Sequence, residues 1–342
     1  ADAEDLGSGV RTGLSDELAQ TEQRRQRVQE ALEQARAADE ARQRQGIDPA
    51  KNPAQVPTTD PDSHVMPNKE GGYAPNYTPI ATTDGERGFI VDSDVLSEVN
   101  EGPAALPSVD RIAETFGKSP DQLLTDGGNN SGQIMAGMEQ RDVEFYAPAE
   151  SNQPQPGNPA FREDPHEPVP PTAWAGLPRN NQKQLDKSCF VYNESEDQYY
   201  CPQGHAMPYE QTKRETRGGE TVNKRTYRCK ACAGCPLAAV CLSPRSKRGR
   251  TITRDQYEEV RERTAARMAT AESQEIYGQR SRIAETPFGI IKSVMGLRQF
   301  LLRGLEKVKT EWLWTVTAFN LMKLAREIGK MRAEFAKLMA TA

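Results

Sequence analysis

The chain lacks much of what a single large core or a membrane anchor needs. Only 36% of its 342 residues are apolar, aromatic residues make up 6%, and the mean hydropathy is −0.78. We therefore expect a substantial part of the chain to be linker or exposed helix. No apolar run approaches the ~20 residues of a membrane span, and no basic and then apolar signal segment opens the chain. The sequence predicts a soluble, cytoplasmic protein.

Histidines and phosphate-binding loops are also scarce. The three histidines, His64, His166 and His205, have no surroundings typical of a Ser-His-Asp hydrolase. No glycine-rich loop of the nucleotide-binding kind occurs either. These absences exclude two common classes of enzyme and turn attention to acids, cysteines and basic residues.

The net charge of −5 hides an uneven distribution along the chain. Residues 1–204 carry 17 basic and 35 acidic side chains, and residues 205–342 carry 27 and 14, which gives −18 and +13. A basic surface of this kind favours a polyanion such as nucleic acid, and packing of a basic half on an acidic half is the alternative.

The order of predicted elements indicates an α/β protein. Residues 15–45 have a helix-forming composition, and residues 77–83 and 89–95 read as a hairpin around a turn that contains Asp84. A helix over 106–117, a strand over 122–125, a helix over 132–140 and a strand over 143–148 follow. Residues 149–184 are rich in Pro, Asn and Gln, and everything from Thr253 onward reads as helix, with Pro287 in a first turn.

The most informative segment lies between Tyr277 and Asn320. On a helix, Glu285 and Lys292 are two turns apart on one face, with Phe288 on an adjacent ridge. A carboxylate and an ammonium placed in this way suit one extended ligand, such as a phosphodiester with a bound cation. An amphipathic helix with a solvated charged face is the alternative.

This segment resembles the C-terminal signature of bacterial insertion-sequence transposases of the Asp-Asp-Glu (DDE) type. In that family, Tyr, Arg, Glu and Lys occur in this order around the last catalytic acid. The resemblance implies that Glu285 is a catalytic acid, that Lys292 holds a phosphate, and that Tyr277 and Arg280 orient DNA near the scissile bond. Arg298 and Arg303 recur at helical spacing and are further candidates for phosphate contacts.

Asp126 is the candidate for the second acid. It follows a predicted strand and precedes two glycines, at the kind of sheet edge where ligands bind, although an ordinary turn is the alternative. The resemblance implies a ribonuclease-H-like fold in which Asp126 and Glu285 bind two Mg²⁺ ions. It extends back to residues 59–63 and 77–84 and covers most of the chain outside the linkers.

The first acid of the family lies on a strand that precedes a helical insertion, which residues 14–44 resemble. Since no strand precedes that helix and the chain opens at Ala1, we expect an incomplete, inactive fragment that lacks the first Asp. Asp84 is the alternative first acid, but it reads as a hairpin residue.

Six cysteines between positions 189 and 241 predict a metal site, since such clustering in a cytosolic protein favours metal over disulfides. A structural tetrahedral zinc site needs four thiolates. We predict Cys201, Cys232, Cys235 and Cys241, the last two within a motif that resembles the insertion of this transposase branch; Cys229 and His205 are alternates. An iron–sulfur cluster is the alternative metal centre.

Together these features predict a DNA transposase that cleaves and joins phosphodiesters at insertion-sequence ends, binds DNA and self-associates on it. The alternative is a non-catalytic, zinc-containing nucleic-acid-binding protein. The expected divisions are a helical segment 1–48, a ribonuclease-H-like part 49–148, a disordered linker 149–188, a Cys-rich zinc module 189–252 and a helical part 253–342.

Overall fold

The computed structural model describes residues 8–44, 48–51, 53–67, 71–149, 152–217, 220–244, 246 and 248–341. The chain forms two compact units, one from residues 1–119 and 279–342 and the other from residues 120–278, and each is described by itself. Ala1, from which an incomplete chain was predicted, lies outside the described residues.

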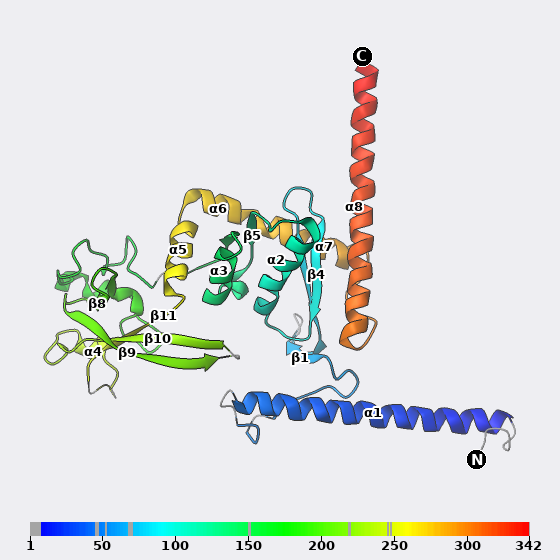
Figure 1. The fold of residues 1–342 in the computed structure, drawn as a ribbon, viewed down its shortest axis with the longest axis horizontal. Coiled ribbons are helices and arrows are strands. Elements are labelled where there is room, and N and C mark those ends of the chain that lie inside the picture. Colours follow the sequence, from blue (N-terminus) through cyan, green and yellow to red (C-terminus); the bar gives the residue numbers. More distant parts are fainter. Residues whose placement is uncertain are drawn as a thin grey trace. The chain divides into compact units, whose positions relative to one another are not determined.

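The first unit combines long helices with two hairpins (Figure 1). Its elements are α1 (Ser8–Arg44), β1 (His64–Pro67), β2 (Tyr73–Asn76), β3 (Thr78–Thr83), β4 (Ile90–Leu96), α2 (Gly102–Phe116), α7 (Arg280–Ser293) and α8 (Leu305–Thr341).

The core of the first unit lies where α7 and α8 pack on the β3–β4 hairpin. β3 and β4 pair antiparallel, from Thr78 opposite Leu96 onward. Side chains from β4 and both helices form one apolar cluster, and its buried members are Ile90, Val95, Ile291, Val308, Trp312, Val316 and Phe319. The start of α8, some 200 residues after the hairpin in sequence, therefore completes its core.

The second unit contains a parallel strand pair and a larger antiparallel sheet. Its elements are β5 (Gln122–Leu124), α3 (Gly132–Glu139), β6 (Glu144–Tyr146), β7 (Val191–Asn193), β8 (Gln198–Tyr200), β9 (Ala206–Arg217), β10 (Glu220–Arg228), α4 (Ala238–Cys241), β11 (Thr251–Asp255), α5 (Glu258–Met268) and α6 (Ala271–Gly278), with short 3₁₀ turns at Gly127–Asn129, Pro171–Gly176 and Lys187–Cys189. β5 pairs parallel with β6, and the antiparallel sheet has the order β11-β10-β9-β8-β7.

Residues 152–188 differ from the disordered linker that the sequence predicts. Ala160, Val169, Leu177 and Leu185 are buried in the same cluster as the cysteines. Backbone hydrogen bonds fix the segment as well, for example from Val169 N to Pro202 O at 2.7 Å. The apolar residues of this segment are sparse but regularly spaced, and their burial orders it. The prediction of disorder from its Pro and Asn content was therefore wrong.

The predicted α/β class is confirmed, and so are the β3–β4 hairpin, α2, β5, α3 and β6 in their predicted order. The expectation that everything after Thr253 is helical is wrong, because Thr251–Asp255 forms β11 against β10. Pro287 lies inside α7 instead of in a first turn, and residues 294–304 form no helix. A helical period read from scattered apolar residues does not show where a helix is interrupted.

The two units also divide the chain differently from the predicted boundaries. The segment expected as one part over 49–148 is split after Ser119, and Asp126 belongs to the unit that contains the cysteines. None of the described helices is long and apolar enough to cross a membrane.

Candidate nucleic-acid and metal site

The exposed face of α7 carries the predicted catalytic acid and the lysine. Glu285 is 67% exposed, and Lys292 is exposed two turns further on. Pro287 and Ile291 point to the opposite, buried side, and the Phe288 ring stacks on Trp312 with centroids 5.7 Å apart. The structure therefore confirms the predicted placement of Glu285 and Lys292 on one accessible face.

Arg280 is half-buried at the start of α7 and lies next to the predicted acid. Its guanidinium Nη2 is 3.6 Å from Oε1 of Glu285. The five-residue gap between them thus allows an ion pair. Because Glu285 is largely exposed, this pair restrains its side chain only weakly and leaves room for another cation.

Arg298 and Arg303 lie in the connection between α7 and α8 and not on a helix. Both side chains are exposed. The connection is fixed near its end, where the backbone N–H groups of Leu301 and Leu302 donate to the Glu311 carboxylate. The predicted helical spacing of these arginines is therefore wrong, while their exposure fits a contact with phosphates.

Asp126 ends the parallel pair in the second unit. It follows β5, and its Oδ1 accepts a hydrogen bond of 2.9 Å from Gly128 N, so it caps a short 3₁₀ turn. The side chain is exposed. Asp126 is thus the residue of an ordinary turn, which was the alternative. The hydrogen bond to Gly128 N uses Oδ1 and leaves Oδ2 available to bind a cation. Tyr277, near the end of α6 in the same unit, is half-buried.

Asp84 is a turn residue, as the sequence predicts. Its Oδ2 accepts from Arg87 N at 2.7 Å and from Gly88 N at 3.2 Å. These hydrogen bonds close the β3–β4 turn. They explain the presence of an aspartate at position 84 without a catalytic role.

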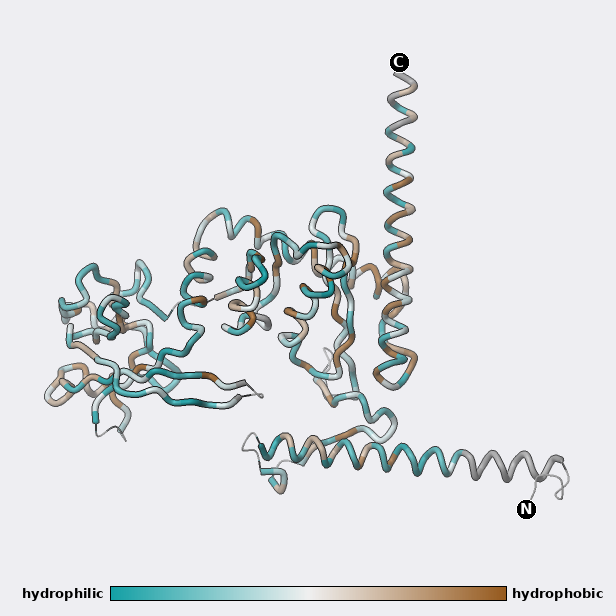
Figure 2. Tube along the Cα trace, viewed as in Figure 1, coloured by the Kyte–Doolittle hydropathy of each residue, from teal (hydrophilic) through white to brown (hydrophobic). Residues whose placement is uncertain are grey.

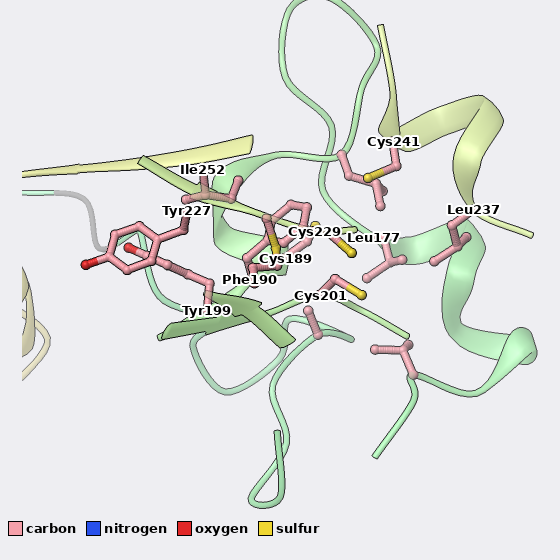
Figure 3. Packing of buried hydrophobic residues seen from close by; sticks show 14 residues of the cluster. Leu177, Cys189, Phe190, Tyr199, Cys201, Tyr227, Cys229, Leu237, Cys241 and Ile252 are labelled. Atoms are coloured by element: carbon pink, nitrogen blue, oxygen red, sulfur yellow. The ribbon is translucent and has the colours of Figure 1, made fainter. Parts of the chain in front are cut away.

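Five cysteines line one pocket in the second unit. The four predicted zinc ligands, Cys201, Cys232, Cys235 and Cys241, lie there together with the alternate Cys229. They come from the turn after β8, the segment after β10, and α4, and Figure 3 shows Cys201, Cys229 and Cys241 among the buried side chains.

The sixth cysteine and the weaker alternate are outside the pocket lining. Cys189 is fully buried, and its thiol donates to Pro178 O at 3.3 Å. His205 is exposed, and its carbonyl oxygen accepts from Cys201 N. The structure therefore separates Cys189 from the other five.

Tight backbone turns bring the pocket cysteines together. Gly204 has φ +73°, and its N–H donates to Cys201 O at 2.8 Å. A Cβ at position 204 would lie 2.0 Å from His166 O, so only glycine fits there. Gly249 has φ +95°, and a Cβ at this position would lie 2.1 Å from Cys229 O. These glycines allow the chain segments to approach around the thiols.

The pocket thiols differ in acidity. A hydrogen bond from the Cys229 thiol lowers the pKa of Cys201 to about 6, with help from the backbone N–H groups of Gln203 and His205. The same interaction raises the pKa of Cys229, and burial raises the pKa of Cys241 to about 12. The Arg250 N–H also donates to Cys232 Sγ at 3.4 Å. Cys201 is therefore the readiest thiolate of the set.

The chemistry of the cysteine thiols favours a bound metal ion, but their positions among the described residues do not form a metal site. Five thiols around one pocket match the chemistry that zinc prefers. Within the described ranges, however, no three His, Cys, Asp or Glu side chains converge closely enough to hold a metal ion. This holds for the thiols and also for the acids near Asp126 and Glu285.

Three basic side chains of β10 have acidic partners. Lys224 pairs with Glu215 at 2.5 Å, and Arg228 pairs with Glu210 at 2.8 Å. Arg225 pairs with Asp197, whose carboxylate also accepts from the Tyr192 and Tyr227 hydroxyls. Part of the positive charge of the β9–β10 hairpin is thus neutralised within its own sheet.

Sequence reasoning missed three polar residues that hold α8 in place. Asp60 Oδ1 accepts from Gly304 N at 3.1 Å and from the Tyr77 hydroxyl, and Asp62 Oδ2 accepts from Leu305 N at 3.0 Å. Asn320 both accepts from Ile90 N and donates to Ile90 O. The segment around Asp60 and the Asn at 320 stood out in the sequence, but nothing local showed that they fix one helix.

Comparison with known proteins supports a single family. Residues 200–325 match the family model described as a transposase DDE domain. The matched segment includes the pocket cysteines, Glu285, Lys292 and both loop arginines, and it excludes Asp126. No curated protein and no solved structure matches the chain.

Residues 200–325 are thus similar to the DDE domain of a transposase. The predicted resemblance to DDE-type transposases is confirmed, and it rests on residues 200–325.

Proposed function

We propose that this protein is a DNA transposase that cleaves and joins phosphodiesters at the ends of an insertion sequence. The match of residues 200–325 to a transposase DDE domain is the observation that carries the proposal. The same match favours it over a non-catalytic nucleic-acid-binding protein. Within the matched segment, the accessible face of α7 presents Glu285 and Lys292 together.

The proposed roles follow the chemistry of each side chain. Glu285 and Asp126 are the metal-binding carboxylates, because their exposed oxygens suit Mg²⁺. Bound Mg²⁺ would activate the attacking oxygen and stabilise the leaving one. Lys292 holds a phosphate, and Arg280, at the start of the same helix, orients DNA near the scissile bond.

The remaining basic and aromatic residues contact the DNA backbone. Arg298 and Arg303, exposed before α8, meet phosphates, and Tyr277 lies near the scissile bond. A ribonuclease-H-like arrangement is part of the proposal. The chain order of an antiparallel β3–β4 pair followed by a parallel β5–β6 pair supports it, while each pair forms a separate two-stranded sheet.

A Mg²⁺-dependent nicking assay on a supercoiled plasmid that carries the ends of the element tests the catalytic proposal. Glu285→Gln should lower nicking at least ~100-fold while binding of a short duplex is retained, since removing one main electrostatic group typically costs that much. Glu306→Gln, an exposed glutamate at the start of α8, is the matched control. Nicking that survives Glu285→Gln would contradict the catalytic role of Glu285, and a wild-type chain that binds no duplex DNA would contradict the proposal. A wild-type chain that binds DNA without nicking it is the outcome expected of the incomplete fragment that the sequence predicts.

We further propose that the cysteine pocket holds one structural zinc ion through Cys201, Cys232, Cys235 and Cys241. Their shared pocket and the lowered pKa of Cys201 support this, because zinc binds thiolates. The spread of the thiols means that they would have to close around the ion.

Elemental analysis of protein prepared without chelator should find about one zinc per chain. Cys235→Ser should lose the zinc, and Cys189→Ser, outside the pocket lining, should keep it. Iron and visible absorbance would favour an iron–sulfur cluster instead, and metal-free protein with an unchanged melting temperature would contradict any metal role.

A further inference from the structure

α8 carries a second apolar stripe that its own unit does not cover. The members of this stripe are Trp314, Leu321, Leu324, Ile328 and Met331, which are exposed by 72, 61, 46, 43 and 67%.

The exposed stripe lies away from the buried one. Val308, Trp312, Val316 and Phe319 face β4 and α7. At about 100° of rotation per residue, the centre of the exposed stripe is turned roughly 150° around the helix axis from these side chains. The helix therefore has two apolar faces, and the described part of the chain covers only one of them.

The spacing of the exposed stripe is that of a coiled coil. Its positions fall at 314, 317, 321, 324, 328 and 331, in alternating steps of three and four. This 3.5-residue period keeps one seam facing a partner helix over several turns. Thr317 is the single polar member. An accidental surface patch has no reason to keep this register.

Residues 328–334 of α8 pack on no other element among the described residues. Every residue from 328 to 334 is exposed, although this stretch contains Ile328 and Met331. Figure 2 shows hydrophobic residues recurring along the length of α8. It also contains Gly329, a poor helix former. An isolated helix of this kind is only marginally stable in water, so a partner would stabilise it.

We propose that this stripe is the seam of a parallel coiled coil between α8 helices of two copies of the chain. With positions 314, 321 and 328 as a and positions 317, 324 and 331 as d, Glu327 falls at g and Arg332 at e. A parallel pair places Glu327 of one copy beside Arg332 of the other. An antiparallel pair would instead place g positions opposite g positions, and the charged g residues, Glu327 and Glu334, are both acidic. Ile328 at a with Leu324 at d also favours two strands.

The proposed dimer interface is separate from the residues proposed for strand cleavage, and it should form in the absence of DNA. Sedimentation analysis of the full chain in the absence of DNA should give a reversible dimer. Leu324→Glu combined with Ile328→Glu should weaken dimerisation at least tenfold, because it buries charge in the seam. Ala333→Glu, exposed at an f position of the same helix, should leave it unchanged.

The direction of the helices has its own test. Glu327→Arg should weaken the dimer, and adding Arg332→Glu should restore it, because the exchanged pair is complementary in a parallel coiled coil. A wild-type monomer at all concentrations would overturn the proposal in favour of another occupant of the stripe, including a segment of the same chain. A dimer unaffected by Leu324→Glu with Ile328→Glu would overturn it as well.

Discussion

At the scale of single residues, Asn320 has a structural role that its place in the family signature does not reveal. Its side-chain amide accepts from Ile90 N at 3.0 Å and donates to Ile90 O at 2.8 Å. It therefore satisfies both backbone groups of a buried residue at the start of β4. Trp312 does the same for one group, by donating from Nε1 to Ile80 O at 2.9 Å.

Asn320→Leu should lower the free energy of unfolding by roughly 2–4 kcal/mol, because it leaves two buried backbone groups without partners. Chemical denaturation measures this loss. Gln299→Leu, an exposed polar residue in the same unit, is the control and should change stability little. Equal stability of the two variants would contradict the role given to Asn320.

Glu258 is a second residue of this kind, because its buried surroundings set the pKa of its carboxyl group. Its carboxylate is 3% exposed and lies 2.6 Å from the Lys187 ammonium, and Arg261 donates to it as well. Burial by itself raises the pKa of Glu258, but Lys187 and Arg261 more than offset this, so its pKa lies below the ordinary value of 4.5. The charged form is thus stabilised by folding.

This depressed pKa predicts a defined pH dependence. The contribution of Glu258 to stability is fully present above about pH 4.5, its unfolded pKa, and is lost as the pH falls through the lower folded pKa. Glu258→Gln should cost about 3–5 kcal/mol at pH 7, since it leaves Lys187 buried without its partner.

Denaturation curves at pH 7 and at pH 3 measure this difference, which should shrink at the lower pH. Glu259→Gln is the matched control, because Glu259 is 66% exposed beside Arg263. A Glu258→Gln variant as stable as the control at pH 7 would contradict the proposed role of the buried pair.

At the scale of elements, α8 begins where two aspartates from a distant segment meet its first N–H groups. Asp60 is only 8% exposed and accepts from Gly304 N and the Tyr77 hydroxyl, and Asp62 accepts from Leu305 N. Burial, together with Asp60, raises the pKa of Tyr77. Negative charge at a helix N-terminus also interacts favourably with the helix dipole.

Asp62→Ala should destabilise the first unit by about 1 kcal/mol through loss of a helix cap. Asp60→Ala should cost more, because Asp60 is buried and leaves both Gly304 N and the Tyr77 hydroxyl without an acceptor. Thermal denaturation measures both losses. Glu86→Ala, exposed in the β3–β4 turn, should have little effect, and a larger effect there than at Asp60 would contradict the assignment.

At the scale of the whole molecule, the positive charge of residues 205–342 should govern contact with DNA. Part of that charge is neutralised in the β9–β10 hairpin by Glu215, Glu210 and Asp197. Within the described residues, Lys292, Arg298 and Arg303 have no such ion pair, and all three are exposed. The effective basic surface is therefore smaller than the composition predicts, and it includes Lys292, Arg298 and Arg303.

Duplex binding should weaken as salt rises, and Arg298→Ala should reduce the slope of log K against log[salt] by about one. The same change should weaken binding to all sequences equally, since a phosphate contact carries no sequence information. Fluorescence anisotropy with a labelled duplex measures both effects. Arg36→Ala, exposed on α1 in the acidic part, is the control, and an unchanged slope for Arg298→Ala would contradict the phosphate contact.

The sequence by itself determined the features that depend on local spacing. The alternation and the turn residues of 77–95 predicted the hairpin. The seven-residue step from Glu285 to Lys292 predicted that they share one helix face. The clustering of the cysteines predicted their common pocket. These follow from helix and strand periods, which any window of the chain contains.

Only the tertiary structure decided what depends on partners far away in the chain. It paired Asp60 with the start of α8 and Asn320 with Ile90, across 244 and 230 residues. It also turned one apolar face of α8 inward and left the other exposed, a distinction that hydrophobicity alone cannot make. The physical reason is that burial and hydrogen bonding at these sites depend on which segments meet, and no local period encodes that meeting.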